Sequence, residues 1–325
     1  MILFAKNEWH LGDNIFVCIF FSKIKKYIEN NNIFINYYCL GEHVNQTKEF
    51  IYSKNIKIFD LNEIPKDENI IDLWIGSGDW EYNAFSNLYY DDNSPNYDVF
   101  LCIFYNNILK NNLKFPIVIE KFIFDNDDLD FLDVAKQINE KTNNKYTNID
   151  LLIINGNPLS NQLHYDKNEW DRIITLFHNK YDNVITTQKV ENVKCTRDDN
   201  LTAKDIAAIS TNAKKIIAID SGVAIGLYNK YTIQNATTYM LCEYSKCDTS
   251  YFVRKRNIQD MMFLLEENKE GFFINSNINY KNVFLLIIAM LLTAFITKLI
   301  IYDNKMIFKS LRSLKKIKIK NSNVS

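Results

Sequence analysis

The sequence predicts an α/β protein with two parallel sheets, and three observations lead to this prediction. Short apolar runs of strand length alternate with longer amphipathic segments through most of the chain. A polar stretch, residues 139–148, interrupts the alternation, and a second series of the same kind begins at residue 150. Small polar turns follow several of the apolar runs, as they do where strands lead into helices. We therefore expect two α/β domains, 1–148 and 149–270, facing each other across a crevice suited to a ligand.

The composition is that of an ordinary globular protein large enough for two domains. The 325 residues include 47% hydrophobic and 24% charged side chains, and chains of this size commonly divide into domains. The net charge of −1 provides no electrostatic basis for binding nucleic acid, so we expect no nucleic-acid partner. The six cysteines include no Cys-x-x-Cys pair, and Cys242 and Cys247 have no histidine nearby. We therefore expect buried free thiols and no metal site.

In the first series, each apolar run is assigned to a strand and each longer segment to a helix. Residues 14–29 illustrate the helical pattern, because Ile15, Ile19 and Ile24 recur at the spacing of one helix face. The same criteria predict strands at residues 1–5, 33–40, 56–59 and 70–75, and further helices at 44–53, 97–113 and 129–141.

The second series begins with the continuous apolar run 150–154, which is typical of a strand buried on both faces. Thr202 precedes a helical segment at the position of an N-cap, where its hydroxyl can accept a hydrogen bond from a free backbone amide. We expect strands at 150–154, 183–187, 215–219 and 237–242, and helices at 169–179, 202–212, 222–228 and 257–267.

The turn between the first strand and the first helix carries the motif His10-Leu11-Gly12-Asp13-Asn14. Ligands of open α/β sheets bind at the carboxyl ends of strands, where helix N-termini present free N–H groups. A carboxylate at this turn can reach a bound hydroxyl, so Asp13 is a candidate for proton transfer. Asp is also a favoured N-cap. Both interpretations can hold together, because a cap at a strand end faces the same edge of the sheet.

A second turn of interest, Asp220-Ser221-Gly222, follows the apolar run 215–219 and precedes a predicted helix. Its backbone N–H groups, the Ser221 hydroxyl and the helix dipole together form a seat suited to a phosphate group. The alternative is an ordinary strand-to-helix turn in which Asp220 caps the helix.

Taken together, these motifs resemble those of the GT-B glycosyltransferases of the bacterial heptosyltransferase type, glycosyltransferase family 9. The resemblance rests on the Gly12-Asp13 turn and on the segment 201–222, LTAKDIAAISTNAKKIIAIDSG, which matches a family pattern of helix, strand and Asp-Ser/Thr-Gly. The loop 155–158 and the segment Glu169-Trp170-Asp171 also match the opening of the family's second domain. The resemblance implies the GT-B fold, in which two Rossmann-like domains face each other across a cleft.

The resemblance further implies transfer of a sugar from a nucleotide-sugar donor to a glycan or lipid-linked acceptor, with inversion and without a metal or other cofactor. Asp13 takes the place of the family's general base. The donor side would comprise the turn Asp220-Ser221-Gly222 and Asn157 of the matching loop. Lys167, just before the Trp170 segment, is a further candidate because cations bind phosphates, although a lysine at a helix start is more often only solvated.

The acceptor side would comprise first-domain residues. His10 and Gly12 flank the proposed base, and Asp79 and Trp80 follow the predicted strand 70–75. Trp stacks well on sugar faces, although a half-buried Trp is equally a core residue.

One position departs from the family pattern. The family usually has His three residues after the Gly of Asp-Ser/Thr-Gly, and this chain has Ile225 there. A phosphate-contacting donor is therefore missing. The departure favours an alternative function, that of a non-catalytic GT-B-like membrane protein that binds a nucleotide or a glycan. A sugar-nucleotide epimerase is a third possibility, but the sequence shows no set of carboxylates and histidines suited to it.

The C-terminal part of the sequence predicts attachment to a membrane. Residues 283–302 are apolar except for Lys298, and twenty such residues suffice to cross a bilayer. The tail 303–325 carries seven lysines and arginines, which favours the cytosol or an anionic headgroup layer. A cytosolic tail after one span would place the main body outside, yet we expect no signal peptide at Met1. We favour a cytoplasmic body with a C-terminal membrane anchor and leave its orientation open.

Overall fold

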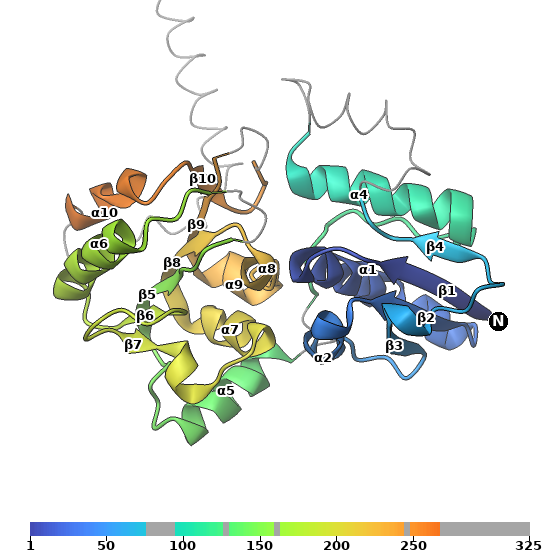
Figure 1. Ribbon diagram of the computed structural model, residues 1–325, viewed down its shortest axis with the longest axis horizontal. Coiled ribbons are helices and arrows are strands. Elements are labelled where there is room, and N and C mark those ends of the chain that lie inside the picture. The colour runs from blue at the N-terminus through green and yellow to red at the C-terminus, as the bar shows by residue number, and fades with distance from the viewer. Residues whose placement is uncertain (76–94, 126–129, 159–162, 244–247, 267–325) are drawn as a thin grey trace, which may run out of the picture. The chain divides into compact units, whose positions relative to one another are not determined.

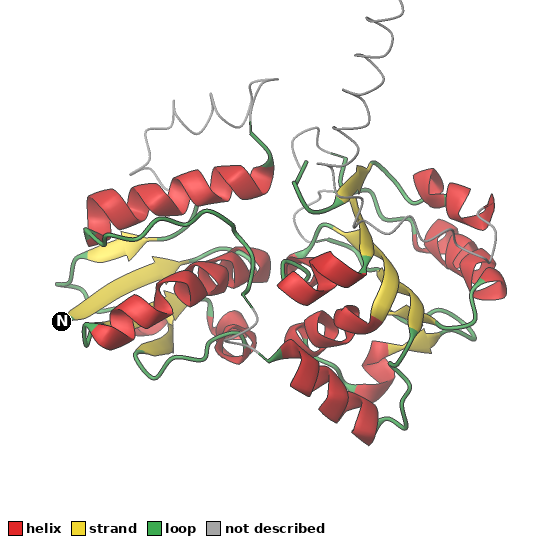
Figure 2. Ribbon diagram, turned by 180° about the vertical axis from the view of Figure 1, so that it is seen from behind, coloured by secondary structure: helices red, strands yellow, loops and turns green. Residues whose placement is uncertain are grey.

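The computed structural model describes residues 1–75, 95–125, 130–158, 163–243 and 248–266 (Figure 1). Residues Met1–Glu267 form one compact unit that contains two parallel β-sheets. Helices flank the strands of each sheet (Figure 2). The predicted α/β class with two parallel sheets is confirmed.

The first sheet has four parallel strands in the order β3-β2-β1-β4. Strand β1 lies in the middle, so the turn that follows it is flanked by the ends of β2 and β4. The strands are β1 (Ile2–Asn7), β2 (Phe34–Cys39), β3 (Ile56–Asp60) and β4 (Ile70–Asp72). The helices of this part are α1 (Leu11–Asn30), α2 (Gly41–Glu49) and α4 (Tyr97–Ile108), with a 3₁₀ turn at Leu61–Glu63 and a π turn at Leu109–Leu113.

The second sheet has six parallel strands in the order β10-β9-β8-β5-β6-β7. Its strands are β5 (Ile149–Ile154), β6 (Val184–Thr186), β7 (Lys194–Cys195), β8 (Ala213–Ile219), β9 (Thr237–Leu241) and β10 (Val253–Lys255). Its helices are α5 (Phe131–Lys141), α6 (Lys167–Lys180), α7 (Ala203–Ile209), α8 (Gly222–Ile225), α9 (Lys230–Asn235) and α10 (Phe263–Glu266). Short 3₁₀ turns lie at Thr196–Asp199, Ser210–Asn212 and Gln259–Met261. Helix α5 packs against α7 although it precedes the expected boundary at residue 148.

Several predicted helices are shorter or begin elsewhere than the sequence indicated. The helix expected at 222–228 ends at Ile225, because the chain then turns so that Tyr228 and Lys230 hydrogen-bond to the backbone of Phe124 at 2.7 and 3.2 Å. The segment 257–267 is divided between a 3₁₀ turn and α10. The N-cap predicted at Thr202 is confirmed, and Asp205 completes a capping box with it.

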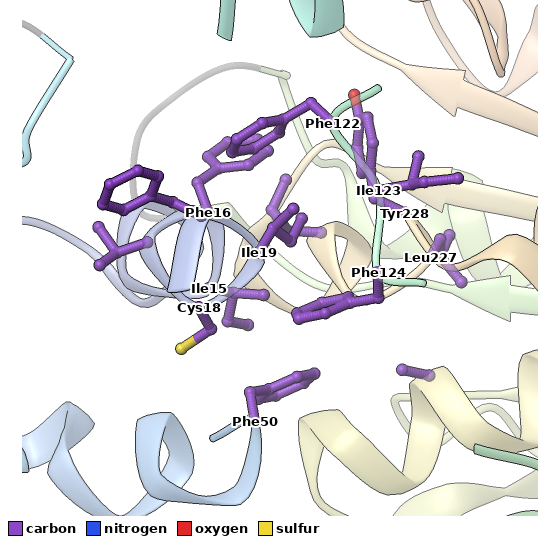
Figure 3. Close-up of a cluster of buried hydrophobic side chains, with 14 of the residues drawn as sticks. Ile15, Phe16, Cys18, Ile19, Phe50, Phe122, Ile123, Phe124, Leu227 and Tyr228 are labelled. Atoms are coloured by element: carbon purple, nitrogen blue, oxygen red, sulfur yellow. The ribbon is translucent and has the colours of Figure 1, made fainter. Parts of the chain in front are cut away.

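One hydrophobic core connects the two sheets within the compact unit. Phe16 and Ile19 of α1 lie in it together with Phe122, Phe124 and Tyr228 (Figure 3). The ring centroid of Phe16 is 6.0 Å from that of Phe122 and 5.8 Å from that of Tyr228. Contacts of this kind fix the orientation of α1. They therefore also fix the position of its first turn, which follows β1.

The structure describes most of the predicted thiols but not the predicted anchor. Cys18, Cys39, Cys102 and Cys195 are buried free thiols and Cys242 is buried, whereas Cys247 lies outside the described residues. In the described parts of the chain, no helix combines the length and the apolar character needed to cross a membrane. The predicted anchor 283–302 and the basic tail 303–325 lie outside those parts and stay predictions.

Candidate functional site

The carboxyl end of β1 leads through three residues into α1, and this turn differs from the predicted one. Helix α1 begins at Leu11, with His10 in the extended conformation as its N-cap residue. Asp13 therefore lies inside the first turn of the helix, and the interpretation of Asp13 as an N-cap is wrong. A carboxylate in the first turn is still favoured by the positive end of the helix dipole.

Asn14 holds this turn in place, and sequence analysis assigned it no role. It is fully buried, and its side-chain amide donates hydrogen bonds to the carbonyl oxygens of Trp9 at 3.1 Å and His10 at 2.9 Å. Its own carbonyl accepts a 2.5 Å hydrogen bond from the hydroxyl of Tyr37 on β2. The amide thus ties the start of α1 to the neighbouring strand. The only signal in the sequence is a polar residue at the start of a strongly apolar helical run.

The pKa of the Asp13 carboxyl lies above that of an exposed aspartate. Burial raises its pKa from an ordinary value of 3.8 to about 6, while the positive charge of His10 and backbone N–H groups of residues 10 and 13 act in the opposite direction. The carboxylate is therefore mostly ionised at neutral pH and is more basic than an exposed aspartate. A general base is most effective when its pKa lies near the working pH.

The two motif turns meet at their glycines. A Cβ atom on Gly222 would lie only 3.0 Å from the amide nitrogen of Gly12 and 3.1 Å from Cβ of Leu11. A Cβ atom on Gly12 would lie 3.3 Å from Cα of Gly222. Only glycine fits both positions without displacing backbone. The structure thus brings the Gly12-Asp13 turn and the Asp220-Ser221-Gly222 turn into direct contact, and α1 packs against α8 (Figure 1).

The Asp220-Ser221-Gly222 turn follows the last residue of β8. The backbone N–H of Asp220 donates to the carbonyl of Leu241 at 3.1 Å, which continues the pairing with β9. Ser221, in an extended conformation, is the N-cap residue of α8, so the interpretation of Asp220 as the cap is wrong. In the described part of the chain the Ser221 side chain makes no capping hydrogen bond.

Ile225, which stands where the resembled family has His, has a packing role. Its side chain is buried, with 4% of its surface exposed, and its Cγ1 lies 3.4 Å from the position of a Cβ on Gly12. The side chain therefore fills the space beside the glycine contact. An apolar group there supplies no hydrogen bond to a phosphate.

The remaining predicted donor residues lie on the loop after β5 and at the start of α6. Asn157 is exposed. Helix α6 begins at Lys167, two residues earlier than expected, because the Asp166 side chain caps it by accepting from Asn168 N–H at 2.9 Å. Lys167 is an exposed residue paired with Asp171 one turn further along.

Asn155 and Gly156 shape that loop. Asn155 is buried and exchanges hydrogen bonds with Thr187, including a 3.1 Å bond from the Thr187 N–H to its side-chain oxygen. Gly156 has φ of +151°, a backbone conformation that side chains disfavour. Sequence analysis matched this loop to a family but did not identify the buried amide that fixes it.

A polar and aromatic cluster that sequence analysis missed lies at the carboxyl ends of β1 and β4. The rings of Trp9 and Trp74 stack with centroids 4.3 Å apart and planes inclined by 22°. Lys6 Nζ lies 3.5 Å from a Glu8 carboxylate oxygen and 3.8 Å from an Asp72 carboxylate oxygen. The predicted acceptor residues Asp79 and Trp80 lie outside the described residues.

A basic cavity, also missed, lies at the carboxyl end of the second sheet. It has a volume of about 370 Å³ and is lined by Asp248, Arg254, Lys255, Arg256 and Asp260. Leu241 of β9 pairs with Ile219 of β8 on one side and with Lys255 of β10 on the other. Arg254 and Lys255 are the last two residues of β10 and Arg256 follows it, so these basic residues lie two strands away from β8, the strand that precedes Asp220. The signal in the sequence is the run Arg254-Lys255-Arg256.

Replacing Gly222 by Ala tests the contact between the two turns. We expect the Gly222→Ala chain to lose about 1–3 kcal/mol of unfolding free energy, because backbone atoms of residues 11 and 12 must move to admit the methyl group. Ser221→Ala is the matched control, with an expected change within about 0.5 kcal/mol. Denaturant unfolding measures both values. Equal midpoints for Gly222→Ala and the parent chain would contradict the observed contact.

The raised pKa of Asp13 predicts a pH-dependent gain in stability for Asp13→Asn. A carboxyl whose pKa is about 6 when folded and near 3.8 when unfolded loses stability as pH rises between these values. We expect Asp13→Asn to be more stable than the parent by about 2–3 kcal/mol at pH 7. The difference should disappear near pH 4. Thermal melting at several pH values measures it, and a pH-independent difference would show that Asp13 has an ordinary pKa.

No family model and no curated protein matches this sequence. Among solved structures, E. coli heptosyltransferase WaaC with ADP is similar over 82% of this chain and 98% of its own, with 11% identity and a TM-score of 0.47. The glycosyl transferase family 9 structure from Veillonella parvula DSM 2008 is similar over 84% of this chain and 91% of its own, with 12% identity and a TM-score of 0.43. E. coli ADP-heptose lps heptosyltransferase II is similar over 82% of this chain and 96% of its own, with 9% identity and a TM-score of 0.40. These structures belong to the type that the sequence motifs resemble, and at such values they assign no activity to this chain.

Proposed function

We propose that the chain is an inverting glycosyltransferase that uses a nucleotide-sugar donor and Asp13 as the general base. The observation that carries the proposal is the half-buried carboxyl of Asp13, whose pKa is raised to about 6, beside the contact of Gly12 with Gly222. A basic carboxylate and a turn suited to phosphate thereby lie on adjacent backbone segments. This combination suits transfer of a group from a phosphate leaving group to a hydroxyl.

In the proposed reaction, Asp13 accepts the proton of an acceptor hydroxyl while the hydroxyl oxygen forms a bond to the anomeric carbon of the donor sugar. The bond from that carbon to the diphosphate oxygen breaks on the opposite face, which inverts the configuration. The electron pair of the broken bond leaves with the nucleoside diphosphate. Backbone N–H groups of the Ser221-Gly222 turn and the Ser221 hydroxyl would stabilise the charge that develops there.

The second sheet offers cations for the diphosphate in place of the family's histidine. Arg254 donates to the backbone carbonyls of Cys242 and Glu243, both at 3.3 Å, so its guanidinium supports the loop after β9. Lys255 and Arg256 line the cavity at the same edge of the sheet as Asp220. We assign Lys255 and Arg256 to binding of the diphosphate. Asn157, on the loop after β5, and Lys167, at the start of α6, belong to the same proposed site.

The acceptor remains a glycan or a lipid-linked sugar in this proposal. The apolar segment 283–302 and the basic tail would attach the chain to a membrane, where a lipid-linked acceptor is found. A body on the cytoplasmic side and a reaction without a metal belong to the same proposal. His10 and Gly12 would border the acceptor hydroxyl because they flank the base.

A non-catalytic protein that binds a nucleotide or glycan is the second candidate. The buried Ile225 favours it, because the position supplies packing where the family supplies a polar group. The two candidates differ in turnover, because only the glycosyltransferase predicts transfer or hydrolysis of the donor sugar.

Asp13→Asn should slow turnover strongly while leaving donor binding intact. With a panel of nucleotide sugars, we expect the variant to hydrolyse or transfer the donor sugar about 10²–10⁴-fold more slowly, because the amide cannot accept the proton. Asp60→Asn, at the carboxyl end of β3, is the control and should keep the parent rate. In the parent chain kcat/KM should fall about tenfold per pH unit below pH 6 and be constant above it. Equal rates for Asp13→Asn and the parent would exclude Asp13 as the base.

Arg256→Ala should weaken binding of a nucleoside diphosphate. With ADP as the probe, we expect the Kd to rise by about 10–100-fold, because a charge-assisted hydrogen bond to phosphate is lost. Arg172→Ala, which removes an exposed arginine from α6, should leave the Kd unchanged. Isothermal titration calorimetry on the full chain measures both. If the two variants bind ADP alike, the cavity after β10 does not hold the diphosphate.

A further inference from the structure

The stacked tryptophans at the carboxyl end of the first sheet form an aromatic surface that the proposed mechanism does not use. Trp9 follows β1 by two residues and is 40% exposed, and its ring stacks on Trp74, two residues after β4. We propose that the Trp9–Trp74 pair binds a sugar of the acceptor by stacking against the apolar face of the sugar ring. The inference deepens the proposed function and rests on it, because that function identifies the bound sugar as the acceptor.

The backbone on both sides of the pair is fixed by hydrogen bonds. The N–H of Trp9 donates to the side-chain oxygen of Asn7 at 3.0 Å. The N–H of Trp74 donates to the Asp72 carboxylate at 2.9 Å, and that of Leu73 to the carbonyl of Lys6 at 2.9 Å. Because Lys6 and Asp72 are also paired in the register of β1 and β4, the backbone of both tryptophans is tied to the pairing of these strands. A rigid aromatic surface loses little conformational entropy when a ligand binds.

The polar groups beside the rings fit a neutral, hydroxyl-rich ligand. Lys6 lies between Glu8 and Asp72, and the three side chains are 26%, 47% and 22% exposed. Carboxylates accept and an ammonium donates hydrogen bonds, which matches the hydroxyls around the edge of a sugar ring. The C–H groups on the face of the ring match the aromatic surface. The group carries two negative charges and one positive charge, which disfavours a phosphate and therefore favours the acceptor over the donor.

The pair is also linked to the proposed base. Asn14 bonds to the carbonyl of Trp9 at 3.1 Å and directly follows Asp13 in the first turn of α1. The His10 ring lies edge-on to Trp9, with centroids 6.4 Å apart. A sugar bound on the rings would therefore lie at the same strand end as the Asp13 carboxylate. Trp9 and Trp74 act as binding residues in this account and take no part in proton transfer.

Binding of simple sugars to the full chain tests the inference without any need for turnover. The probes are the methyl glycosides of glucose, galactose, mannose and N-acetylglucosamine, observed by saturation-transfer difference NMR. We expect at least one to bind, with the strongest transfer at its ring C–H protons. Trp9→Ala and Trp74→Ala should weaken that binding about tenfold or more, in line with the loss of one aromatic stacking contact.

Phe34→Ala is the matched control. Phe34 is 42% exposed but begins β2 at the opposite, amino edge of the same sheet, so its loss should leave sugar binding unchanged. Trp9→Phe keeps an aromatic face and should retain most of the binding, which separates a loss of stacking from a loss of folding. The Kd for ADP should be the same in all four variants.

The failures of the two proposals are distinguishable. Absence of binding by all four glycosides to the parent chain overturns the inference, as does equal binding by Trp9→Ala and Phe34→Ala. Neither result affects the test of Asp13, which measures turnover of the donor. Conversely, if Asp13→Asn turns over normally but the tryptophan variants lose sugar binding, the proposed base is wrong and the sugar site stands.

Discussion

The close approach of the Gly12 and Gly222 backbones is the constraint on which the candidate site depends. Two turns from different sheets come so near that neither glycine admits a Cβ atom without a shift of backbone. Phe16 of α1 packs against Phe122 and Tyr228 in the hydrophobic core, and this packing fixes the direction of α1 (Figure 3). A rigid core and two glycines therefore set the position of the carboxylate that follows Gly12.

The position of Asp13 is favourable for proton transfer and unfavourable for stability. Burial raises the pKa of the carboxyl, and the ionised form is therefore held in the folded chain at a cost in unfolding free energy. The buried hydrogen bonds of Asn14 with Trp9, His10 and Tyr37 help to hold the turn in spite of this cost. Strain of this kind is common where a group must react, because solvation that stabilises a carboxylate also lowers its basicity.

The two sheets offer different chemistry at their carboxyl ends. The first presents two aromatic rings and a mixed charge group around Lys6, which suit a neutral polyhydroxyl ligand. The second presents a backbone turn after β8 and a basic run at the end of β10, which suit an anion. In the proposed function, this division would place acceptor binding on the first sheet and donor binding on the second. Ile225 fills the space beside Gly12, and in the same proposal Arg256 would supply the positive charge that Ile225 lacks.

The sequence by itself determined the α/β class, most strands and helices, the Thr202 cap and the two motif turns. Those features depend on the spacing of apolar residues and on capping groups within one turn of the chain, so neighbouring residues specify them. Only the tertiary structure decided that Asp13 lies inside α1, that Asn14 anchors the turn, that Trp9 stacks on Trp74 and that Gly12 touches Gly222. The bond from Tyr37 to Asn14, the stacking of the tryptophans and the glycine contact depend on strand order or on packing between segments distant in sequence. The start of α1 at Leu11 is a helix boundary, which sequence patterns locate poorly. The physical reason is that burial and pairing across sheets are properties of the folded chain, which no local pattern records.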